Sequence, residues 1–357
     1  MKGRVLVAGF STRHVAQSAA RAGYEVCAVD HFCDQDLAWY TREREKFDEL
    51  DELPDAIARL AQRYAFDGIV LTSGAEALPT TIPVCGTPRE RVNRFLDKLD
   101  IQHFFEELHV PVPRLAAPGE YPVMIKPRRG AGGWRNQVVA SSEQLSAWDA
   151  LYPETPYIAQ EIITGIPASV CCISDGTHAR AIATNEQLLR GREGAAFGFS
   201  GSVTPFDHPL HHEMIRVAER IAAASGCTGT VGIDFVVSTT TPCAIEINPR
   251  FQGTLDTVEA AYDLNLFACH VDACAGRLPE TRRPVRYAAR SILFCDRDLT
   301  LTVDLKHLTP MVADIPVPGT FFEEGQAVVS VFGSGATRSE ALSMLDTNIS
   351  TVRQYMQ

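Results

Sequence analysis

The chain of 357 residues has an ordinary globular composition, 45% hydrophobic and 22% charged, which excludes a largely disordered protein. At about 150 residues per domain, this length predicts two or three domains. The net charge is −11 and the isoelectric point is near 5.4. A net acidic surface repels phosphate backbones and anionic lipids, so we expect binding neither to nucleic acid nor to a membrane surface.

The cysteines and apolar runs indicate the compartment. Ten cysteines are scattered along the chain without a CxxC pair, which is typical of a reduced protein rather than a disulfide framework. No apolar run approaches the roughly 20 residues of a membrane helix. The apolar stretch at the N-terminus is too short for a signal peptide. We therefore expect a cytoplasmic protein.

The first part of the chain alternates short apolar runs with helical patterns. This alternation predicts a parallel sheet covered by helices. The expected strands are 4–8, 25–29 and 68–71, and the expected helices are 14–21 and 54–64. The first strand ends at Gly9, but two of the three glycines of a dinucleotide-binding turn are missing after it. We therefore expect an α/β domain without a cofactor of its own.

Helical patterns continue beyond this domain. Thr87 is expected to cap a helix that has Pro88 in its first turn. A longer amphipathic helix is expected from Asp207 to Ser225, ended by Gly226. The proline-rich segment 110–113 places a domain boundary nearby. The expected domains are an N-terminal domain over 1–95, a second domain over 96–285 with a lid at about 115–163, and a closing segment over 286–357.

A basic, glycine-rich loop follows an apolar strand near residue 126. The strand ends in Lys126, and the loop contains Arg129, Gly130, Gly132 and Gly133. Glycines let backbone N–H groups crowd an anion, and the lysine adds a positive charge. The loop lacks the GK[ST] ending of the Walker pattern. The loop alone therefore leaves a phosphate site and a solvated turn about equally open.

A second feature is an apolar strand that begins near Tyr157 and ends in a turn. Its last residues are Gln160, Glu161, Ile162 and Ile163. A purine needs an apolar slot with hydrogen-bonding groups at its edge, and this segment has both. Taken alone, however, an edge strand with Glu161 in water is the favoured interpretation.

The strongest pattern is a predicted hairpin between residues 231 and 250, in which five polar residues join two apolar strands. If the hairpin is symmetric about the middle of its loop, Asp234 lies directly opposite Glu246. Glu246, Asn248 and Arg250 then share one strand face. Carboxylate and amide oxygens are typical Mg²⁺ ligands beside phosphate, and paired carboxylates without a cation would be costly among apolar neighbours. A solvated polar face is the less favoured alternative.

In chain order these features resemble the ATP-grasp superfamily, over roughly residues 90–285. The residues that carry the resemblance are Lys98, Lys126 with its glycine-rich loop, Gln160, Glu161, Asp234, Glu246, Asn248 and Arg250. Residues 315–337 resemble the closing segment of biotin-carboxylase-like members. The chain looks most like the predicted ATP-dependent carboligases related to biotin carboxylase. The resemblance implies an α/β fold with a Rossmann-like domain, a two-lobed α+β ATP-grasp domain and a small C-terminal α+β segment.

The resemblance also implies a nucleotide site. The lysines would hold the phosphates of ATP, the loop would close over them, and the strand end near Glu161 would contact the adenine. The implied nucleotide-binding residues are Lys98, Lys126, Arg129, Gly130, Gly132, Gly133, Gln160, Glu161, Ile162 and Ile163. Residues 166–168 contain no carboxylate for the ribose, which departs from many members of the superfamily.

The same resemblance implies a metal site and a catalytic pair. Asp234, Glu246 and Asn248 would bind Mg²⁺, as two ions, with Mn²⁺ as an alternative. Arg250 and Lys126 would act on the phosphoryl group during its transfer. The site for the second substrate is open: a substrate-binding arginine, Arg190 or Arg192, and a plain connecting loop are about equally favoured.

The implied reaction is an ADP-forming ligation. A small-molecule carboxylate attacks the γ-phosphate of ATP, and an amine then displaces phosphate from the acyl-phosphate. An amino-acid-like acyl substrate, in cofactor biosynthesis, is suggested by analogy only. The alternatives are a carboxylase that activates bicarbonate and a non-catalytic nucleotide sensor, which the complete set of polar residues disfavours. A homodimer stays open, because an apolar face of the N-terminal domain would serve equally as core.

Overall fold

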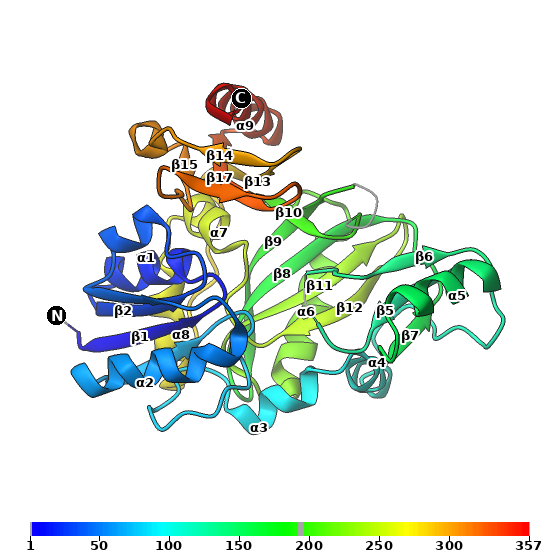
Figure 1. Ribbon diagram of the computed structural model, residues 1–357. Coiled ribbons are helices and arrows are strands. Elements are labelled where there is room, and N and C mark those ends of the chain that lie inside the picture. Colours follow the sequence, from blue (N-terminus) through cyan, green and yellow to red (C-terminus); the bar gives the residue numbers. More distant parts are fainter. Residues whose placement is uncertain (1, 131, 192–195, 357) are drawn as a thin grey trace.

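The computed structural model describes residues 2–130, 132–191 and 196–356 (Figure 1). These residues form an N-terminal α/β domain, a large antiparallel sheet with a smaller sheet beside it, and a C-terminal layer that extends the large sheet. Among the helices in these ranges, none has the length and apolar character to cross a membrane.

The N-terminal domain is a parallel sheet of four strands in the order β3-β2-β1-β4. Alternate residues of β1 point to opposite faces, so Val5 and Val7 pack toward α1 while Leu6 and Ala8 pack toward α2. The predicted parallel sheet is confirmed. The elements are β1 (Arg4–Gly9), α1 (Arg13–Arg21), β2 (Glu25–Asp30), β3 (Glu43–Lys46), α2 (Leu53–Arg63) and β4 (Gly68–Leu71).

The central sheet has eight antiparallel strands in the order β12-β11-β8-β9-β10-β13-β17-β15. One face is covered by α4 (Lys98–Glu107) and α6 (His211–Ser225), whose apolar residues share a core with the strands. The strands are β8 (Ile166–Asp175), β9 (Ala179–Leu189), β10 (Phe199–Thr204), β11 (Thr228–Val237), β12 (Pro242–Asn248), β13 (Tyr287–Phe294), β15 (Val312–Ala313) and β17 (Ala327–Gly335).

A smaller antiparallel sheet of order β6-β5-β7 lies near the β11–β12 end of the central sheet (Figure 1). Trp148 of its helix α5 is buried against Val123 and Ile125, which explains why this short sheet has a core of its own. The elements are β5 (Val123–Pro127), β6 (Gln137–Val139), α5 (Ser142–Leu151) and β7 (Tyr157–Gln160).

The three parts of the fold are joined by a shared core and a buried ion network. Phe251 and Phe267 pack in the same cluster as Val5 and Val7 of the N-terminal sheet. Arg13 contacts Asp256 at 2.7 Å and Asp314 at 2.8 Å, and so ties α1 to α7 and to the C-terminal layer. The remaining α-helices and strands are α3 (Arg89–Val92), α7 (Leu255–Tyr262), α8 (Leu266–Cys274), β14 (Leu299–Leu301), β16 (Thr320–Phe322) and α9 (Arg338–Arg353).

Two helix starts differ from the sequence prediction. Helix α3 begins at Arg89 with Pro88 as its cap, because the Thr87 hydroxyl is bonded instead to the backbone of Thr228, at 3.1 Å. Helix α6 begins at His211 rather than Asp207. Its predicted end is confirmed, since Gly226 takes the left-handed conformation with φ of 68°.

Candidate active site

A cavity of about 500 Å³ lies between the small sheet and the β8–β11–β12 part of the central sheet. The small sheet contributes Met124 and Lys126, and the central sheet contributes residues of β8, β9, β11 and β12. Glycine-loop residues Gly132 and Gly133 border the same space. The cavity therefore lies between two lobes, and most of the residues predicted to bind a nucleotide or metal line it.

The paired carboxylates come from the predicted hairpin, but its loop length and register differ from the prediction. Asp234 of β11 pairs directly with Glu246 of β12, as predicted. The loop, however, has four residues rather than five, and Phe235 pairs with Ala244. A bulge at Ile245 restores the register. The two carboxylates therefore face one space at the point where the ladder is irregular.

Asp234 is the most strongly perturbed carboxyl of the cavity. Burial, with the nearby charge of Glu246 as a second cause, raises the pKa of Asp234 to about 7. Its oxygens accept hydrogen bonds from the side-chain amides of Gln187, at 2.9 Å, and Asn248, at 3.0 Å. The amides of Gln187 and Asn248 thus present their N–H groups to Asp234, while the Asn248 amide oxygen faces Arg250.

Two lysines approach this acidic pair from the other side of the cavity. Lys98, the first residue of α4, lies 3.6 Å from the Glu246 carboxylate and donates a hydrogen bond of 2.6 Å to the Gly130 carbonyl oxygen. Burial, assisted by the charge of Lys98, lowers the pKa of Lys126 to about 8, while Glu246 opposes this shift. An anion in the cavity would stabilise the charged form of both lysines.

Arg250 is held by partners on two elements. Its guanidinium donates to the Asn248 amide oxygen at 3.0 Å and forms an ion pair with Glu76 of the N-terminal domain. The side chains of Arg250 and Glu76 are only 13% and 16% exposed. The ion pair therefore links the end of β12 to the N-terminal domain and places the guanidinium at the cavity wall.

The glycine-rich loop is anchored at its first residues by Arg128, and at Gly133 it lies against the backbone of Phe197. Arg128 is clamped by Asp97, with an N–O distance of 2.7 Å. Gly133 has φ of 72°, and a β-carbon there would lie 2.2 Å from the Phe197 carbonyl oxygen, so only glycine fits. Gly130 borders an adjoining cavity, whereas Arg129 is exposed and lines neither space.

The residues at the strand end near Glu161 point in two directions, some toward the cavity and one into the core. Glu161, Ile162 and Ile163 line the cavity. Gln160 points away from it, is 2% exposed and donates to the side chain of Gln102 at 2.7 Å, because neighbouring strand residues face opposite sides. The Glu161 carboxylate accepts from the Arg114 N–H at 2.8 Å, so it is not free in water.

Several lining residues escaped the sequence analysis. Gln252 is 8% exposed, and neither polar atom of its amide has a hydrogen-bond partner among the described residues. The buried Thr254 hydroxyl also has no hydrogen-bond partner among them. Both line the cavity just after Arg250. Gln187 and Glu76 were also missed. A signal existed only for Gln252, which continues the two-residue spacing of 246, 248 and 250.

An adjoining cavity of about 330 Å³ extends from the acidic pair toward the N-terminal domain. It shares Lys98, Glu246, Asn248 and Arg250 with the main cavity, and its other walls include Phe10, Leu50, Gly74 and Phe95. A second, partly apolar molecule would fit beside the charged residues.

The expected substrate-binding arginines lie elsewhere. Arg190 donates to the Gly325 carbonyl oxygen at 3.0 Å, and its guanidinium stacks on Phe294 with 4.0 Å to the ring centroid. It therefore helps attach the C-terminal layer and does not line the main cavity. Arg192 lies outside the described residues.

Comparison with known proteins identifies the domain that contains the cavity. Residues 95–254 match the family model of the ATP-grasp domain. An uncharacterized protein of Methanocaldococcus jannaschii is 24% identical over 366 residues, which cover 94% of this chain and 89% of that protein. This relative spans all parts of the fold described above.

Two solved structures share the architecture. The biotin carboxylase domain of 2-oxoglutarate carboxylase from Hydrogenobacter thermophilus, a dimer solved with MgADP, ADP and bicarbonate, has a TM-score of 0.80 at 13% identity, covering 98% of this chain and 90% of that one. Phosphoribosylamine–glycine ligase from Thermotoga maritima has a TM-score of 0.76 at 16% identity, covering 97% and 96%. Residues 95–254 of this chain thus match the ATP-grasp domain family, and the chain as a whole shares the fold of these two structures.

Proposed function

We propose that this protein is an ADP-forming ligase that phosphorylates a small-molecule carboxylate and joins it to an amine. One observation carries the proposal: Asp234, Glu246 and Asn248 converge with Lys98 and Lys126 in a single cavity. A carboxylate pair opposed by two lysines suits a metal–triphosphate complex, in which charges of both signs must be balanced. The similarity to a named ligase and a named carboxylase supports this type of reaction.

The nucleotide would occupy the main cavity. Its apolar walls include Met124, Val138, Val236 and Ile245, which suit the faces of a purine. The adenine would meet the strand end at Glu161 to Ile163. The triphosphate would then extend toward the lysines and the glycine-rich loop, whose N–H groups and closure would exclude water.

The donor set fits Mg²⁺. Asp234, Glu246 and Asn248 offer hard oxygen ligands, and burial together with the charge of Glu246 raises the pKa of Asp234, so a bound cation would stabilise the ionised pair. Once bound, Mg²⁺ would neutralise charge on the phosphates of ATP. These three side chains would bind one or two Mg²⁺ ions. Gln187, which donates a hydrogen bond to Asp234, would orient that carboxylate.

The carboxylate substrate would bind in the adjoining cavity, next to Arg250. Its oxygen attacks the γ-phosphorus, the bond to the β-phosphate oxygen breaks, and ADP leaves. Arg250 and Lys126 stabilise the negative charge on the moving phosphoryl group. The amine then attacks the acyl carbon, phosphate departs with the former carboxylate oxygen, and the amine loses a proton. An amino-acid-like acyl group matches the mixed polar and apolar walls.

The test is ADP release from Mg-ATP with pools of carboxylates and amines, with and without hydroxylamine, which traps an acyl-phosphate as hydroxamate. Glu246→Gln removes one ligand charge, and Glu107→Gln on the exposed side of α4 is the matched control. We expect ADP release that requires one carboxylate pool, yields hydroxamate, and disappears only in Glu246→Gln.

Other outcomes would replace the proposal. ADP release that requires bicarbonate and no organic acid would assign the protein to the carboxylases. Tight ATP binding without turnover on any pool or bicarbonate would favour a nucleotide sensor. An absence of ATP binding would contradict the assignment of the cavity itself.

A further inference from the structure

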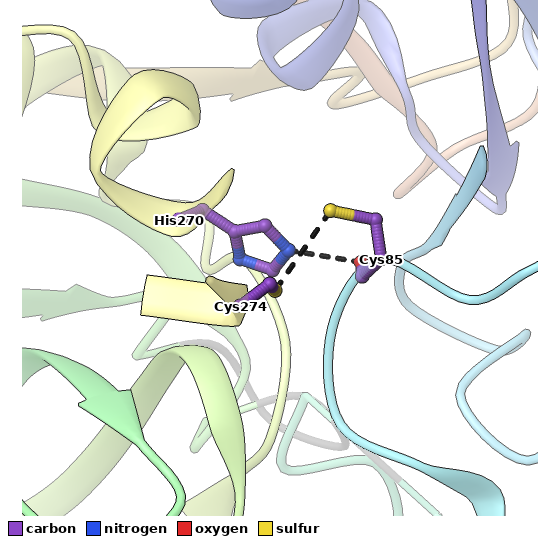
Figure 2. Close-up of side chains that lie close together, drawn as sticks. All are labelled: Cys85, His270 and Cys274. Atoms are coloured by element: carbon purple, nitrogen blue, oxygen red, sulfur yellow. Dashed lines mark hydrogen bonds between the residues drawn. The ribbon is translucent and has the colours of Figure 1, made fainter. Parts of the chain in front are cut away.

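A cluster of two cysteines and a histidine lies outside the main cavity, where the N-terminal domain meets α8 (Figure 2). Cys85 follows β4, and His270 and Cys274 are one helical turn apart on α8. The two sulfur atoms are 3.8 Å apart although the residues are separated by 189 positions in sequence. The sequence analysis assigned no role to this cluster, because Cys85 is remote from the other two residues.

Both sulfur atoms are held in place by regular structure. The Cys85 N–H donates to the Ile69 carbonyl oxygen at 2.8 Å, and Ile69 pairs with Val84, so this segment continues the edge of the N-terminal sheet. Cys274 is the last residue of α8, a helix fixed by the fully buried Phe267. The proximity of the two thiols is therefore built into the packing of two domains.

The histidine is committed to hydrogen bonds and is poorly suited to bind a metal. Its Nδ1 accepts from the Thr230 N–H at 2.9 Å, so the ring proton is on Nε2. Nε2 then donates to the Cys85 carbonyl oxygen at 2.9 Å (Figure 2). With both nitrogens engaged, His270 has no lone pair to offer, and the cluster reduces to a pair of thiols.

The two thiols differ in acidity and in access. The pKa of Cys85 is lowered, chiefly by the hydrogen bond with Cys274, while burial opposes the shift. The pKa of Cys274 is raised by the same hydrogen bond. Cys85 is partly exposed and Cys274 is exposed, so a small oxidant can reach them. One thiolate nucleophile beside one protonated thiol is the arrangement that favours sulfur oxidation.

We propose that Cys85 and Cys274 form a redox-active pair that a peroxide converts to an intramolecular disulfide between the N-terminal domain and α8. The Cys85 thiolate attacks a peroxide oxygen, the O–O bond breaks, and a sulfenic acid and water form. The Cys274 sulfur then attacks the sulfenic sulfur, a second water leaves, and the disulfide forms. In total two thiols lose two hydrogens to one peroxide, and an added thiol reverses the reaction.

The pair lies close to the proposed catalytic residues. A narrow cavity between the two sites is lined by Cys85, Glu76, Arg250 and His270. The His270 ring packs on Phe251, the residue after Arg250, with ring centroids 4.6 Å apart. Disulfide formation does not depend on the proposed ligase activity, and its test uses no turnover assay.

The experiment treats the reduced full-length protein with hydrogen peroxide and maps its peptides by mass spectrometry. We expect a Cys85 peptide linked to a Cys274 peptide, with a mass lower by two hydrogen atoms than the sum of the free peptides, and loss of the link after dithiothreitol. Two of the ten thiols should disappear in a thiol titration. Neither Cys85→Ser nor Cys274→Ser should give a linked peptide. Cys85→Ser should lose no thiol and Cys274→Ser only one, because Cys85 then stops at the sulfenic acid, whereas Cys269→Ser, a partly exposed neighbour on α8, should behave like the wild type.

A second measurement covers the case in which a serine variant fails to fold. Because the bond closes a long loop, the oxidised wild-type protein should melt about 5 °C above the reduced protein. Recovery of both cysteines as free thiols or as separate oxidised residues, without a linked peptide, would overturn the proposal. So would stoichiometric zinc that protects both thiols from peroxide.

Discussion

Replacing Asp234 with asparagine should stabilise the metal-free protein at alkaline pH while removing its response to Mg²⁺ and nucleotide. In the folded chain the pKa of Asp234 rises from 3.8 to about 7, because the carboxyl is buried and Glu246 lies beside it. The folded state therefore binds one more proton than the unfolded state between these pH values. Stability falls as pH rises through this window, and the loss is complete above about pH 7.

The size of this effect follows from the two pKa values. A difference of about three pH units corresponds to about 4 kcal/mol, an upper limit because the cavity admits some water. Asparagine has the same shape and no charge, so the variant avoids this cost. The Gln187 amide that donates to Asp234 can still donate to the oxygen of the new side chain.

The assay is urea unfolding of both proteins at pH 5 and pH 8, with and without MgADP. At pH 8 the variant should exceed the metal-free wild type by about 1 to 4 kcal/mol, and at pH 5, about one unit above the unfolded pKa of 3.8, by less than half of that amount. MgADP at 100 times its dissociation constant should stabilise the wild type by about 2.7 kcal/mol and leave the variant unchanged. Asp149→Asn, at an exposed position of α5, is the matched control and should show neither effect.

Two results would refute this reasoning. A variant that is less stable than the wild type at pH 8 would mean that the ionised carboxylate stabilises the empty site. A variant that MgADP stabilises as much as the wild type would mean that Asp234 is not a metal ligand.

Three further predictions concern the nucleotide and the phosphoryl group. ATP affinity should fall as pH rises from 7 to 9.5 in titration calorimetry, because Lys126, whose pKa burial lowers to about 8, loses its charge; equal affinities would contradict this. Arg250→Lys should lower kcat about 100-fold with ATP affinity nearly unchanged, since lysine cannot engage Asn248 and Glu76 together; an unchanged kcat in the hydroxamate assay would exclude the role. Gly133→Ala should raise KM for ATP about tenfold through its clash with Phe197, whereas Gly119→Ala, also at positive φ but with no atom within 4 Å of the added carbon, should leave KM unchanged.

The sequence predicted the parallel N-terminal sheet and the pairing of Asp234 with Glu246, because both depend on local patterns. Apolar runs that alternate with helical periods give the sheet, and a short polar loop between apolar strands gives the hairpin. The bulge at Ile245 could not be predicted. The loop is one residue shorter than predicted, and β12 contains one extra residue at the bulge. The two differences cancel, so the regular hairpin assumed in the prediction still gave the correct pair.

Contacts between segments that are distant along the chain could not be predicted from the sequence. Glu76 meets Arg250 across 174 positions, and Cys85 meets Cys274 across 189. Neither pair belongs to a shared periodic pattern, so only the packing of the N-terminal domain against the chain that follows β12 brings them together. Gln160 shows a different limit: it lies beside Glu161 in sequence, but the alternation of the strand turns its side chain into the core.

The most direct test of carboxylate activation follows the carboxylate oxygen. The carboxylic acid identified by ADP release is labelled with oxygen-18 and incubated with Mg-ATP, the amine and the protein, and the released phosphate is analysed by mass spectrometry. We predict that the phosphate carries an oxygen-18 atom, because the carboxylate oxygen leaves with the phosphoryl group of the acyl-phosphate. Unlabelled phosphate, or release of AMP and pyrophosphate in place of ADP, would contradict the proposed function.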